Sequence, residues 1–328
     1  MIRVGVAGTG IIVREVLPLL RGWGFEPAAL CGTPRSKDEV EELCKEHKIL
    51  KGFCDYEEMV AYEGIDCVYV AVPNFLHDSF VQKALEQGKN VIVEKPMTSN
   101  VHEAQMLSGL AREKNLFLFE AISTVYLPNY KKIQQWLPLI GTVKIVSCNF
   151  SNYSRRYDAF RSGTVLPAFD PAKSGGALMD LNLYNLHYIL GLFGEPKSAR
   201  YMPNIERGID TSGVLFMDYG SFQAVSIAAK DCSAPWSYCI QGTDGYILQK
   251  SPANFCLEVT LHRNDGTEET FDEEPESRLE PEFLTFAQEM EAGDTRFCYE
   301  MLDHSLAVSK VQTQVRLDAG IVFPADEA

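Results

Sequence analysis

The chain begins with an apolar run, Ile2–Ala7, that leads into a glycine-rich turn and then into an amphipathic helical pattern. Gly8 permits a tight turn, and Gly10 lets the backbone approach a pyrophosphate, which the free N–H groups at the helix N-terminus bind. Val13 departs from the G-x-G-x-x-G/A pattern at its third position, where a small residue allows helix and strand to pack closely.

Strand, turn and helix in this order favour a dinucleotide-binding unit over a glycine turn that binds nothing. In such a unit, the turn and the first residues of the helix contact the cofactor. The residues expected at the cofactor in this segment are Gly8, Thr9, Gly10, Ile11 and Ile12.

Short apolar runs alternate with amphipathic stretches up to about residue 120. The predicted strands are Ile2–Ala7, Ala28–Cys31, Cys67–Val72, Asn90–Glu94 and Leu116–Ile122, and the predicted helices are Ile11–Arg21, Lys37–His47, Phe75–Gln87 and Val101–Lys114. Runs that are apolar on both faces fit a parallel sheet with helices on each side. The first half is therefore predicted to be an α/β domain with a doubly wound parallel sheet of the Rossmann type.

Beyond Pro128 the pattern changes to short strands joined by tight turns. The predicted strands are Thr142–Ser151, Lys197–Pro203, Thr211–Met217, Ser221–Ala229, Trp236–Gly242, Phe255–Arg263 and Thr267–Phe271, and the predicted helices are about Gly176–Leu192, Arg278–Ala292 and Tyr299–Asp318. Such short connections require mostly antiparallel pairing. We expect a Rossmann domain over 1–123 and, over 124–328, an α+β domain with a large, mostly antiparallel open sheet. The C-terminal helices can pack back on the first domain.

The end of the second predicted strand bears on the choice between NAD and NADP. An NAD site usually has an acidic residue there, about 20 residues past the glycines, for the ribose 2′-hydroxyl. Here the segment carries Thr33, Arg35 and Lys37 and no acid. Hydroxyl and cationic groups suit a 2′-phosphate, so NADP is favoured over NAD. The alternative is that Arg35 and Lys37 belong to a solvated start of a helix.

Two polar segments follow the next strands. Because ligands of open α/β sheets bind outside the carboxyl ends of the strands, residues at these ends should face the cofactor. They are Pro73, Asn74 and His77 after one strand and Glu94 and Lys95 after the next. A nearby cationic nicotinamide would lower the pKa of a lysine at this place, which could then polarise or protonate a carbonyl oxygen. The alternative is an ordinary surface lysine.

In the second half, the helix predicted from about Gly176 carries three proton-handling side chains. Asp180, Tyr184 and His187 stand at i, i+4 and i+7, so one face of a helix would present all three. They form a candidate acid–base cluster. The alternative is a polar seam packed against the other domain, with His187 as a buried histidine whose hydrogen bonds are satisfied.

Composition excludes several other classes of protein. The formal net charge is −15, which disfavours nucleic acid and anionic membranes as partners. No apolar run approaches the roughly 20 residues of a membrane span, and Arg3 opens a strand-like segment rather than a signal peptide, so a cytoplasmic protein is expected. The nine cysteines contain no CxxC pair and the six histidines no ligand pair at helical spacing, so no metal site is expected.

Taken together, these segments resemble the Gfo/Idh/MocA oxidoreductases, the relatives of glucose–fructose oxidoreductase, inositol dehydrogenases and dimeric dihydrodiol dehydrogenase. The resemblance covers nearly the whole chain. The matching residues are Gly8-Thr9-Gly10, Pro73-Asn74 with His77, Glu94-Lys95-Pro96, Glu120-Ala121, and Gly175-Gly176-Ala177-Leu178 with Asp180 and Tyr184. Asn182 replaces a common glycine, and Thr124-Val125-Tyr126 lacks an arginine found in the dihydrodiol branch.

The resemblance implies hydride transfer between the nicotinamide of NAD(P) and a secondary alcohol or carbonyl of a sugar, polyol or dihydrodiol-like substrate. It makes Lys95 the catalytic lysine, places Asp180 beside it, and gives Tyr184 the position of the family's His or Tyr. It also implies that His187 contacts substrate and that an open sheet face serves for a homodimer or a dimer of dimers. Further candidate substrate contacts, from the stretch before Asp170, are Arg155, Arg156, Tyr157 and Arg161.

Two other functions remain open at this stage. One is a non-catalytic NAD(P)-binding sensor or regulator with the same fold, against which the intact set of Lys95, Asp180 and Tyr184 speaks. The other is a reductase of an imine or of a large conjugated substrate, which would need the same cofactor domain with different pocket walls.

Overall fold

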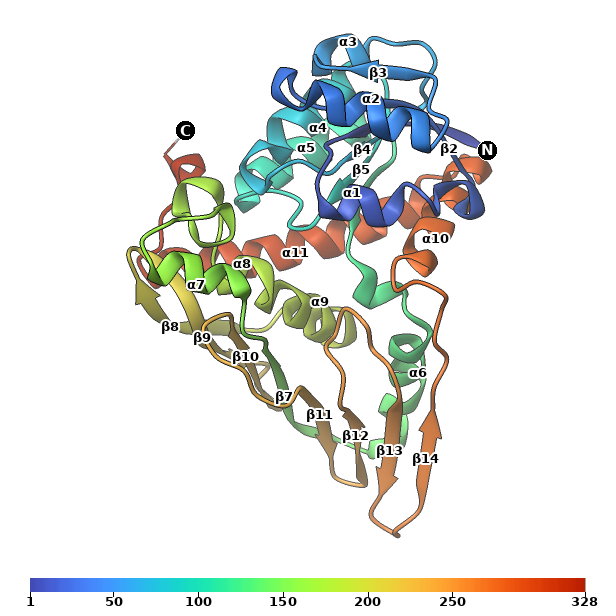
Figure 1. The fold of residues 1–328 in the computed structure, drawn as a ribbon. Helices are drawn as coiled ribbons and strands as arrows, with labels where there is room; N and C mark the ends of the chain where they lie inside the picture. Colours follow the sequence, from blue (N-terminus) through green and yellow to red (C-terminus); the bar gives the residue numbers. More distant parts are fainter. Residues whose placement is uncertain (328) are drawn as a thin grey trace. The chain divides into compact units, whose positions relative to one another are not determined.

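The computed structural model describes residues 1–327, which form two compact units (Figure 1). The first unit holds Met1–Ala121 together with Glu282–Leu306. The second holds Ile122–Pro281 and the chain from Ala307 onward. The domain limits expected from the sequence, 1–123 and 124–328, remain a prediction.

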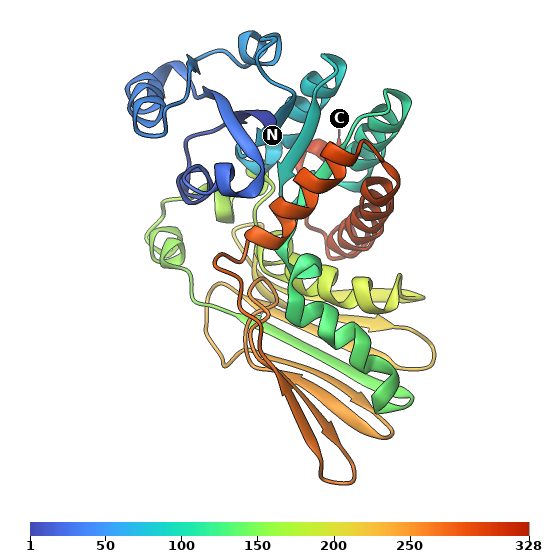
Figure 2. The same cartoon turned by 90° about the vertical axis from the view of Figure 1, so that its right-hand side faces the viewer.

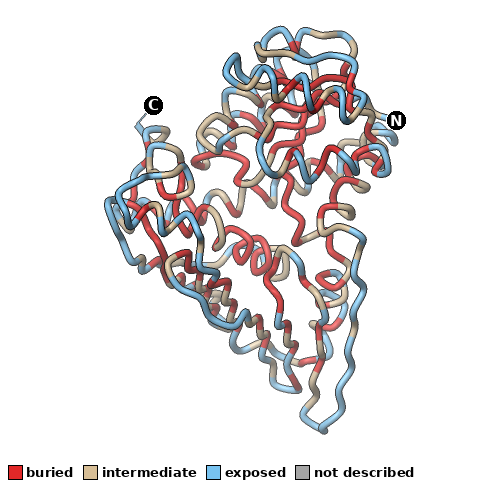
Figure 3. The backbone as a smooth tube through the Cα atoms, viewed as in Figure 1, coloured by how far each residue is buried: buried red, intermediate tan, exposed pale blue. Residues whose placement is uncertain are grey.

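The first unit is built on a six-stranded parallel sheet with the strand order β3-β2-β1-β4-β5-β6. The strands are β1 (Ile2–Ala7), β2 (Phe25–Cys31), β3 (Lys51–Phe53), β4 (Cys67–Val70), β5 (Asn90–Glu94) and β6 (Leu118–Ala121). All residues of β4 and β6 are buried, as Figure 3 shows for the centre of this unit in red. The doubly wound parallel sheet is thereby confirmed.

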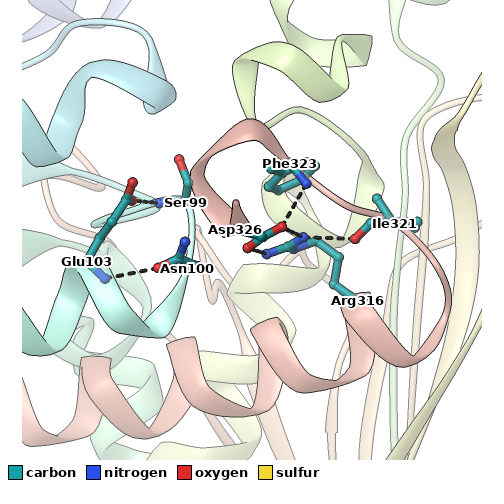
Figure 4. A network of polar contacts seen from close by, with 7 residues as sticks. All are labelled: Ser99, Asn100, Glu103, Arg316, Ile321, Phe323 and Asp326. Atoms are coloured by element: carbon teal, nitrogen blue, oxygen red, sulfur yellow. Dashed lines mark hydrogen bonds and ion pairs between the residues drawn. The ribbon is translucent and has the colours of Figure 1, made fainter. Parts of the chain in front are cut away.

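Helices connect these strands. They are α1 (Ile11–Val16), α2 (Lys37–Glu46), α3 (Tyr56–Val60), α4 (His77–Glu86) and α5 (Val101–Glu113). Asn100 begins α5 by accepting the N–H of Glu103 at 2.9 Å, and the Glu103 carboxylate accepts the N–H of Ser99 at 2.9 Å (Figure 4). These bonds give partners to the N–H of Glu103, which the first helical turn leaves open, and to the N–H of Ser99 just before the helix.

A helix from late in the chain completes the first unit. Helix α10 (Glu280–Ala292) brings Phe283 and Phe286 onto the parallel sheet. The Phe283 ring lies 5.4 Å from those of Trp23 and Tyr69, and Phe286 stacks on Phe119 at 4.4 Å. Helix α11 (Arg296–Asp318) follows. Burial of large aromatic side chains is a strong local contribution to the stability of this core.

The second unit contains an eight-stranded sheet with the order β14-β13-β12-β11-β7-β10-β9-β8. The strands are β7 (Val143–Ser151), β8 (Ser198–Glu206), β9 (Ile209–Asp218), β10 (Gln223–Ala229), β11 (Ser237–Gly242), β12 (Gly245–Gln249), β13 (Val259–Arg263) and β14 (Glu268–Phe271). Only β7 and β10 pair in parallel within this described sheet. The mostly antiparallel sheet is thus confirmed.

Helices cover one face of this sheet, as Figure 2 shows. They include α6 (Pro128–Trp136), which contacts β13, and α9 (Asn182–Phe193), which contacts β7 and β10. Along β10, buried Ala224, Ser226 and Ala228 alternate with the partly exposed Val225 and Ile227. The sheet therefore has one covered face and one open face.

The C-terminal segment of the second unit is held by a buried ion pair. Arg316 of α11 is 1% exposed and donates to both carboxylate oxygens of Asp326, at 2.6 and 2.8 Å (Figure 4). Asp326 also accepts the N–H of Phe323, over whose ring the guanidinium lies at 3.9 Å. A bidentate pair of this kind fixes geometry as well as charge.

Several sequence predictions of elements were wrong in detail. The first helix ends at Val16 rather than Arg21, and the helix predicted at Gly176–Leu192 is two helices, α8 (Ala177–Asp180) and α9, separated at Leu181. The break lies beside Asn182, whose buried side chain accepts a hydrogen bond from Ser226 on β10.

Other elements were not predicted. Strands β3 and β12 and helix α6 had no counterpart in the sequence prediction, and the stretch before Asp170 contains helix α7 (Arg155–Arg161). Ser154 begins α7 by accepting the N–H of Arg156. No helix among residues 1–327 is long and apolar enough to cross a bilayer.

Candidate active site

The glycine turn after β1 is closed on two sides by neighbouring strands. Gly8 has φ +123° and donates its N–H to the carbonyl of Cys31 at 2.8 Å. A Cβ at this position would lie 2.4 Å from the carbonyl oxygen of Ala71. Only glycine fits both the backbone conformation and this close approach.

Gly10 faces open space. Nothing lies within 4 Å of the place where its Cβ would be, and its φ of −71° suits any residue. The absence of a side chain at Gly10 therefore serves no purpose inside the unit itself, and leaves room for a ligand against the backbone at the start of α1. Val13, which departs from the motif, is fully buried, and its Cγ2 lies 3.6 Å from the position of a Cβ on Gly8.

A cavity of about 490 Å³ opens beside the turn. It lies outside the carboxyl ends of β1, β2 and β4, where open α/β sheets bind nucleotides, and its volume is in the usual range for a cofactor site. The lining residues are Gly8, Thr9, Gly10, Cys31, Gly32, Thr33, Ser36, Tyr56, Ala71, Val72, Pro73, Leu76 and Phe80. The residues present therefore fit a dinucleotide, with open backbone at the turn and mostly apolar walls.

The end of β2 presents hydroxyl groups to this cavity. Ser36 Oγ accepts the N–H of Thr33 at 2.9 Å, which closes a short turn and holds both side chains at the cavity wall. Arg35 lies between them in sequence and is exposed. Of the residues expected at the cofactor, Ile11 is 76% exposed and Ile12 is half-buried.

An acidic residue that the sequence argument missed lies next to the turn. Glu39, in the first turn of α2, accepts the Thr9 hydroxyl at 2.9 Å and pairs with Arg14 of α1. The Arg14 hydrogen bond, followed by that from Thr9, lowers the pKa of Glu39. Because Glu39 belongs to the start of a helix and not to the end of β2, the sequence pattern did not indicate that it lies next to Thr9.

His77 connects the two strand-end segments from inside the unit. The ring is fully buried, with Nδ1 2.8 Å from the carbonyl oxygen of Pro96 and Nε2 2.9 Å from that of Val72. Burial lowers the pKa of His77. A neutral ring carries one N–H, so His77 donates to one of these two carbonyl oxygens, and it lies between the loops that carry Asn74 and Lys95.

The segment after β5 is held on both sides of its lysine. Tyr69 donates its hydroxyl to Glu94 at 2.5 Å, and the buried Glu120 accepts the N–H of Met97 at 2.8 Å. The Lys95–Pro96 peptide bond is cis, and Lys95 is half-buried. Glu120, part of the resemblance quoted above, therefore supports the backbone next to Lys95.

In the second unit, the three residues predicted on one helix face are divided between α8 and α9. Asp180 ends α8 and is 33% exposed, whereas Tyr184 and His187 lie on α9 at 8% and 0%. Tyr184 packs against Phe150 of β7. The single regular stripe expected from a continuous helix is therefore interrupted between Asp180 and Tyr184.

Asp180 has a partner that the sequence argument missed. Lys230, directly after β10, donates to its Oδ2 at 2.8 Å, although the lysine side chain is only 3% exposed. A lysine at the end of a strand is usually exposed to solvent. The signal that could have found it is its place directly after the mostly apolar run from Val225 to Ala229.

The predicted substrate contacts before Asp170 lie on α7. Arg155, Arg156 and Arg161 are exposed, and Tyr157 is half-buried between Phe160 and Phe169. Tyr157 donates to Glu206 at 2.7 Å, and this hydrogen bond raises the pKa of Tyr157 to about 12. Tyr157 is therefore a neutral hydroxyl at ordinary pH.

Among the residues that the structure describes, no three His, Cys, Asp or Glu side chains gather closely enough to hold a metal ion.

Comparison with known proteins shows that this sequence is similar to oxidoreductases. Residues 2–122 match the sequence family described as the GFO_IDH_MocA oxidoreductase family with an NAD-binding Rossmann fold, and residues 134–248 match the GFO/IDH/MocA C-terminal domain. The chain is 34% identical to scyllo-inositol 2-dehydrogenase (NADP(+)) of Bacillus subtilis, with all of both chains covered.

Two further similarities are more distant. D-xylose 1-dehydrogenase (NADP(+)) 2 of Haloferax volcanii is 29% identical, with 94% of each chain covered. The crystal structure of a 3-ketoreductase from Actinomadura kijaniata, in complex with NADP and TDP-benzene, superposes with a TM-score of 0.84 at 22% identity, covering 96% of this chain and 97% of that one. The last comparison supports the fold alone.

Proposed function

The chain belongs to the GFO/IDH/MocA family of oxidoreductases with an NAD-binding Rossmann fold, and from this we propose that it is an NADP-dependent dehydrogenase of sugars, polyols or dihydrodiol-like compounds. The observation that carries the proposal is the open backbone at Gly10 beside the 490 Å³ cavity, at the carboxyl ends of the parallel strands. The family comparison favours this enzyme over a non-catalytic sensor.

The proposed preference for NADP rests on the end of β2. Thr33 and Ser36 line the cavity there, Arg35 is exposed next to them, and no acidic residue occupies the place that usually binds the ribose 2′-hydroxyl. The nearby Glu39 is already paired with Arg14. Two of the relatives are named as NADP(+) enzymes, which supports the same choice.

We assign proton transfer to Lys95, Asp180 and Tyr184, as the family resemblance implies. The bound nicotinamide would supply the hydride chemistry, and the protein orients substrate and moves the hydroxyl proton. A Tyr184 phenol is a weak base at neutral pH, so a lysine ammonium would have to favour its phenolate. His187 and the α7 residues Arg155, Arg156, Tyr157 and Arg161 remain proposed contacts for substrate.

Absorbance at 340 nm tests the proposal. The purified chain is incubated with NADP, and separately with NAD, against inositols, aldoses, uronic acids and trans-dihydrodiols. We expect reduction of NADP with at least one of these classes and slower reduction of NAD. Tight cofactor binding without turnover of any class would instead favour a sensor, and faster reduction of NAD would contradict the cofactor preference.

We further propose a homodimer, or a dimer of dimers, formed through the open face of the second unit's sheet. Ile145, Met202, Phe216 and Tyr246 are 39–55% exposed on β7, β8, β9 and β12. Apolar side chains gathered on one sheet face are typical of an interface. A Phe216→Glu variant should shift the mass measured by light scattering toward the monomer; a wild-type monomer at micromolar concentration would contradict the proposal.

The cytoplasmic location expected from the sequence is part of the proposal as well. All nine cysteines are free thiols, which suits a reducing compartment, and burial raises the pKa of eight of them.

A further inference from the structure

Lys230 is a buried cation in a unit whose other lysines are mostly at the surface. Its side chain is 3% exposed and lies directly after β10. Removing an ammonium group from water is costly unless an anion and hydrogen bonds compensate for the lost hydration. The surroundings of Lys230 therefore have to account for this burial.

Three contacts surround its Nζ atom. It donates to Asp180 Oδ2 at 2.8 Å and to the carbonyl of Ala168 at 2.9 Å, and it lies 4.7 Å from the centre of the Phe169 ring. A carboxylate, a carbonyl and an aromatic face together satisfy the three N–H directions of an ammonium group. The donors of the Lys230 ammonium group thus all have partners, and the side chain is shielded from solvent. This arrangement suits a residue that holds a neighbouring side chain in place, and it does not suit one that delivers a proton to substrate.

The backbone of α8 is fixed independently of Lys230. Asp210 at the start of β9 accepts the N–H of Leu178 at 2.6 Å, and Gln312 of α11 donates to the carbonyl of Leu178 at 3.1 Å. Gly176, with φ +110°, leaves no room for a Cβ, which would lie 2.1 Å from Asp210 Oδ1. These contacts set the path of the helix but do not reach the Asp180 side chain.

Lys230 also attracts the carboxylate of Asp210, whose Oδ2 accepts the N–H of Leu178. Besides Leu178, Asp210 accepts the hydroxyl of Tyr201 at 2.7 Å. The adjacent Asp231 accepts the hydroxyls of Thr211 and Ser212 at 2.7 and 2.8 Å. Among these three acids, Asp180 is the one for which a direct bond to Lys230 is observed.

We propose that Lys230 is a positioning residue, which holds the Asp180 carboxylate ionised and in one orientation for the reaction. The inference rests on the proposed function, since it assigns to Lys230 the orientation of a residue that we place in proton transfer. An opposite charge at hydrogen-bond distance favours the carboxylate form, and a saturated buried lysine leaves Asp180 little freedom to rotate.

A set of variants at both residues tests the proposal, with kcat, KM, cofactor Kd and Tm measured for each. Lys230→Met keeps the length of the side chain and removes the charge. We expect kcat to fall by about 10- to 100-fold, since misplacing a catalytic group by about 1 Å has an effect of this size. KM and cofactor Kd should change by less than about threefold, because the loss lies in the transition state.

The double variant Lys230→Met/Asp180→Asn separates positioning from a general structural role. If Lys230 acts through Asp180, kcat of the double variant is no lower than that of Asp180→Asn alone. Losses that multiply, or a kcat of Lys230→Met within about threefold of wild type, would overturn the proposal. Lys230→Gln, which retains an N–H donor, should show the same split between kcat and KM and provides the test if the methionine variant folds poorly.

Lys250→Met is the matched control, because Lys250 also directly follows a strand of this sheet but is exposed. It should leave kcat and Tm unchanged. Thermal unfolding of the wild type, Lys230→Met, Asp180→Asn and the double variant measures the coupling between Lys230 and Asp180 even without turnover. Absence of coupling in unfolding overturns the inference alone, whereas a coupled pair in a wild-type protein that oxidises no substrate overturns the proposed function, and the inference with it.

Discussion

The cofactor region of the first unit and the polar centre of the second unit are constructed in different ways. In the first, much of the cavity wall comes from short segments at or just after strand ends, such as Gly8–Gly10 after β1, and Tyr56 and Phe80 of two helices complete it. In the second, Asp180 accepts a hydrogen bond from Lys230, and the helix that carries it is bonded to Asp210 and Gln312. The residues of the first site belong to short continuous motifs in the sequence. Those of the second are far apart in the sequence and come together only in the folded chain.

From this difference we predict a division of function between two groups of residues. Changes at the cavity wall of the first unit affect cofactor binding, and changes at the proposed acid–base residues, Lys95 included, affect turnover. The largest effect is expected at Lys95. Lys95→Ala should lower kcat by roughly 10²- to 10⁴-fold, the usual contribution of a general acid–base group, with cofactor Kd within a few fold of wild type. Steady-state rates at 340 nm and a fluorescence titration measure the two. Lys51→Ala, at an exposed position in the same unit, is the control. Normal turnover of Lys95→Ala would exclude the proposed role.

In the second unit, a pH effect on stability is expected at Asp210. Burial raises the pKa of Asp210 to about 6, from an ordinary value of 3.8. Between about pH 4 and pH 6 the folded state thus binds more protons than the unfolded state, so the contribution of Asp210 to stability is complete below about pH 4 and is lost as pH rises through 6. Relative to Asp210→Asn, the wild type should lose on the order of 3 kcal/mol over this range.

Urea unfolding of both proteins from pH 4 to pH 7 measures this difference. Asp272→Asn, which changes an exposed carboxylate of the same unit, should show no comparable pH dependence. A difference between wild type and Asp210→Asn that stays constant over the whole range would contradict the assignment.

Within the first unit, variants of the two glycines of the turn separate effects on stability from effects on cofactor binding. Gly8→Ala meets a carbonyl oxygen and a positive φ, so it should lower the free energy of unfolding of the cofactor-free protein by about 2 kcal/mol. Gly10→Ala meets nothing in the protein and should leave that free energy within about 0.5 kcal/mol. Its cofactor Kd should nevertheless rise by at least about tenfold, because the methyl group enters the space proposed for the pyrophosphate. Unchanged cofactor affinity in Gly10→Ala would place the dinucleotide elsewhere.

The smallest effect is expected at Arg35. Arg35→Ala should raise Kd for NADP by about tenfold, in line with the loss of one charge-assisted hydrogen bond, and change Kd for NAD by less than about twofold. Competition titrations of the two cofactors measure both values. Lys45→Ala, at the exposed end of α2, provides the matched control. An equal loss for both cofactors would mean that Arg35 does not distinguish the 2′-phosphate.

The two units also differ in how much of them could be predicted from the sequence. The parallel strands and the glycine turn were predictable because apolar runs and turn glycines act locally; β1 and β5 begin and end where the pattern indicated. The short edge strand β3 was missed because Lys51, Gly52 and Phe53 give no apolar run. Glu39 was missed because its distance from Thr9 depends on the packing of α2.

In the second unit, local pattern predicted the antiparallel sheet but not the break between α8 and α9. Beside the break, Asn182 accepts a hydrogen bond from Ser226, which lies 44 residues further along the chain. The pairing of Asp180 with Lys230 spans 50 residues in the same way. Contacts at such separations follow from the register of β10 within the sheet, and residue spacing along the chain carries no information about it.

Transfer of deuterium from substrate to cofactor tests the central claim most directly. The wild-type chain is incubated with NADP and a sugar or inositol carrying deuterium on the carbinol carbon, and the mass of the reduced cofactor is measured. The proposed hydride transfer predicts NADPH heavier by about one mass unit, since the deuterium moves directly to the nicotinamide. Reduced cofactor without deuterium, or no reduced cofactor with any substrate class in the panel, would contradict a dehydrogenase acting on CH–OH groups.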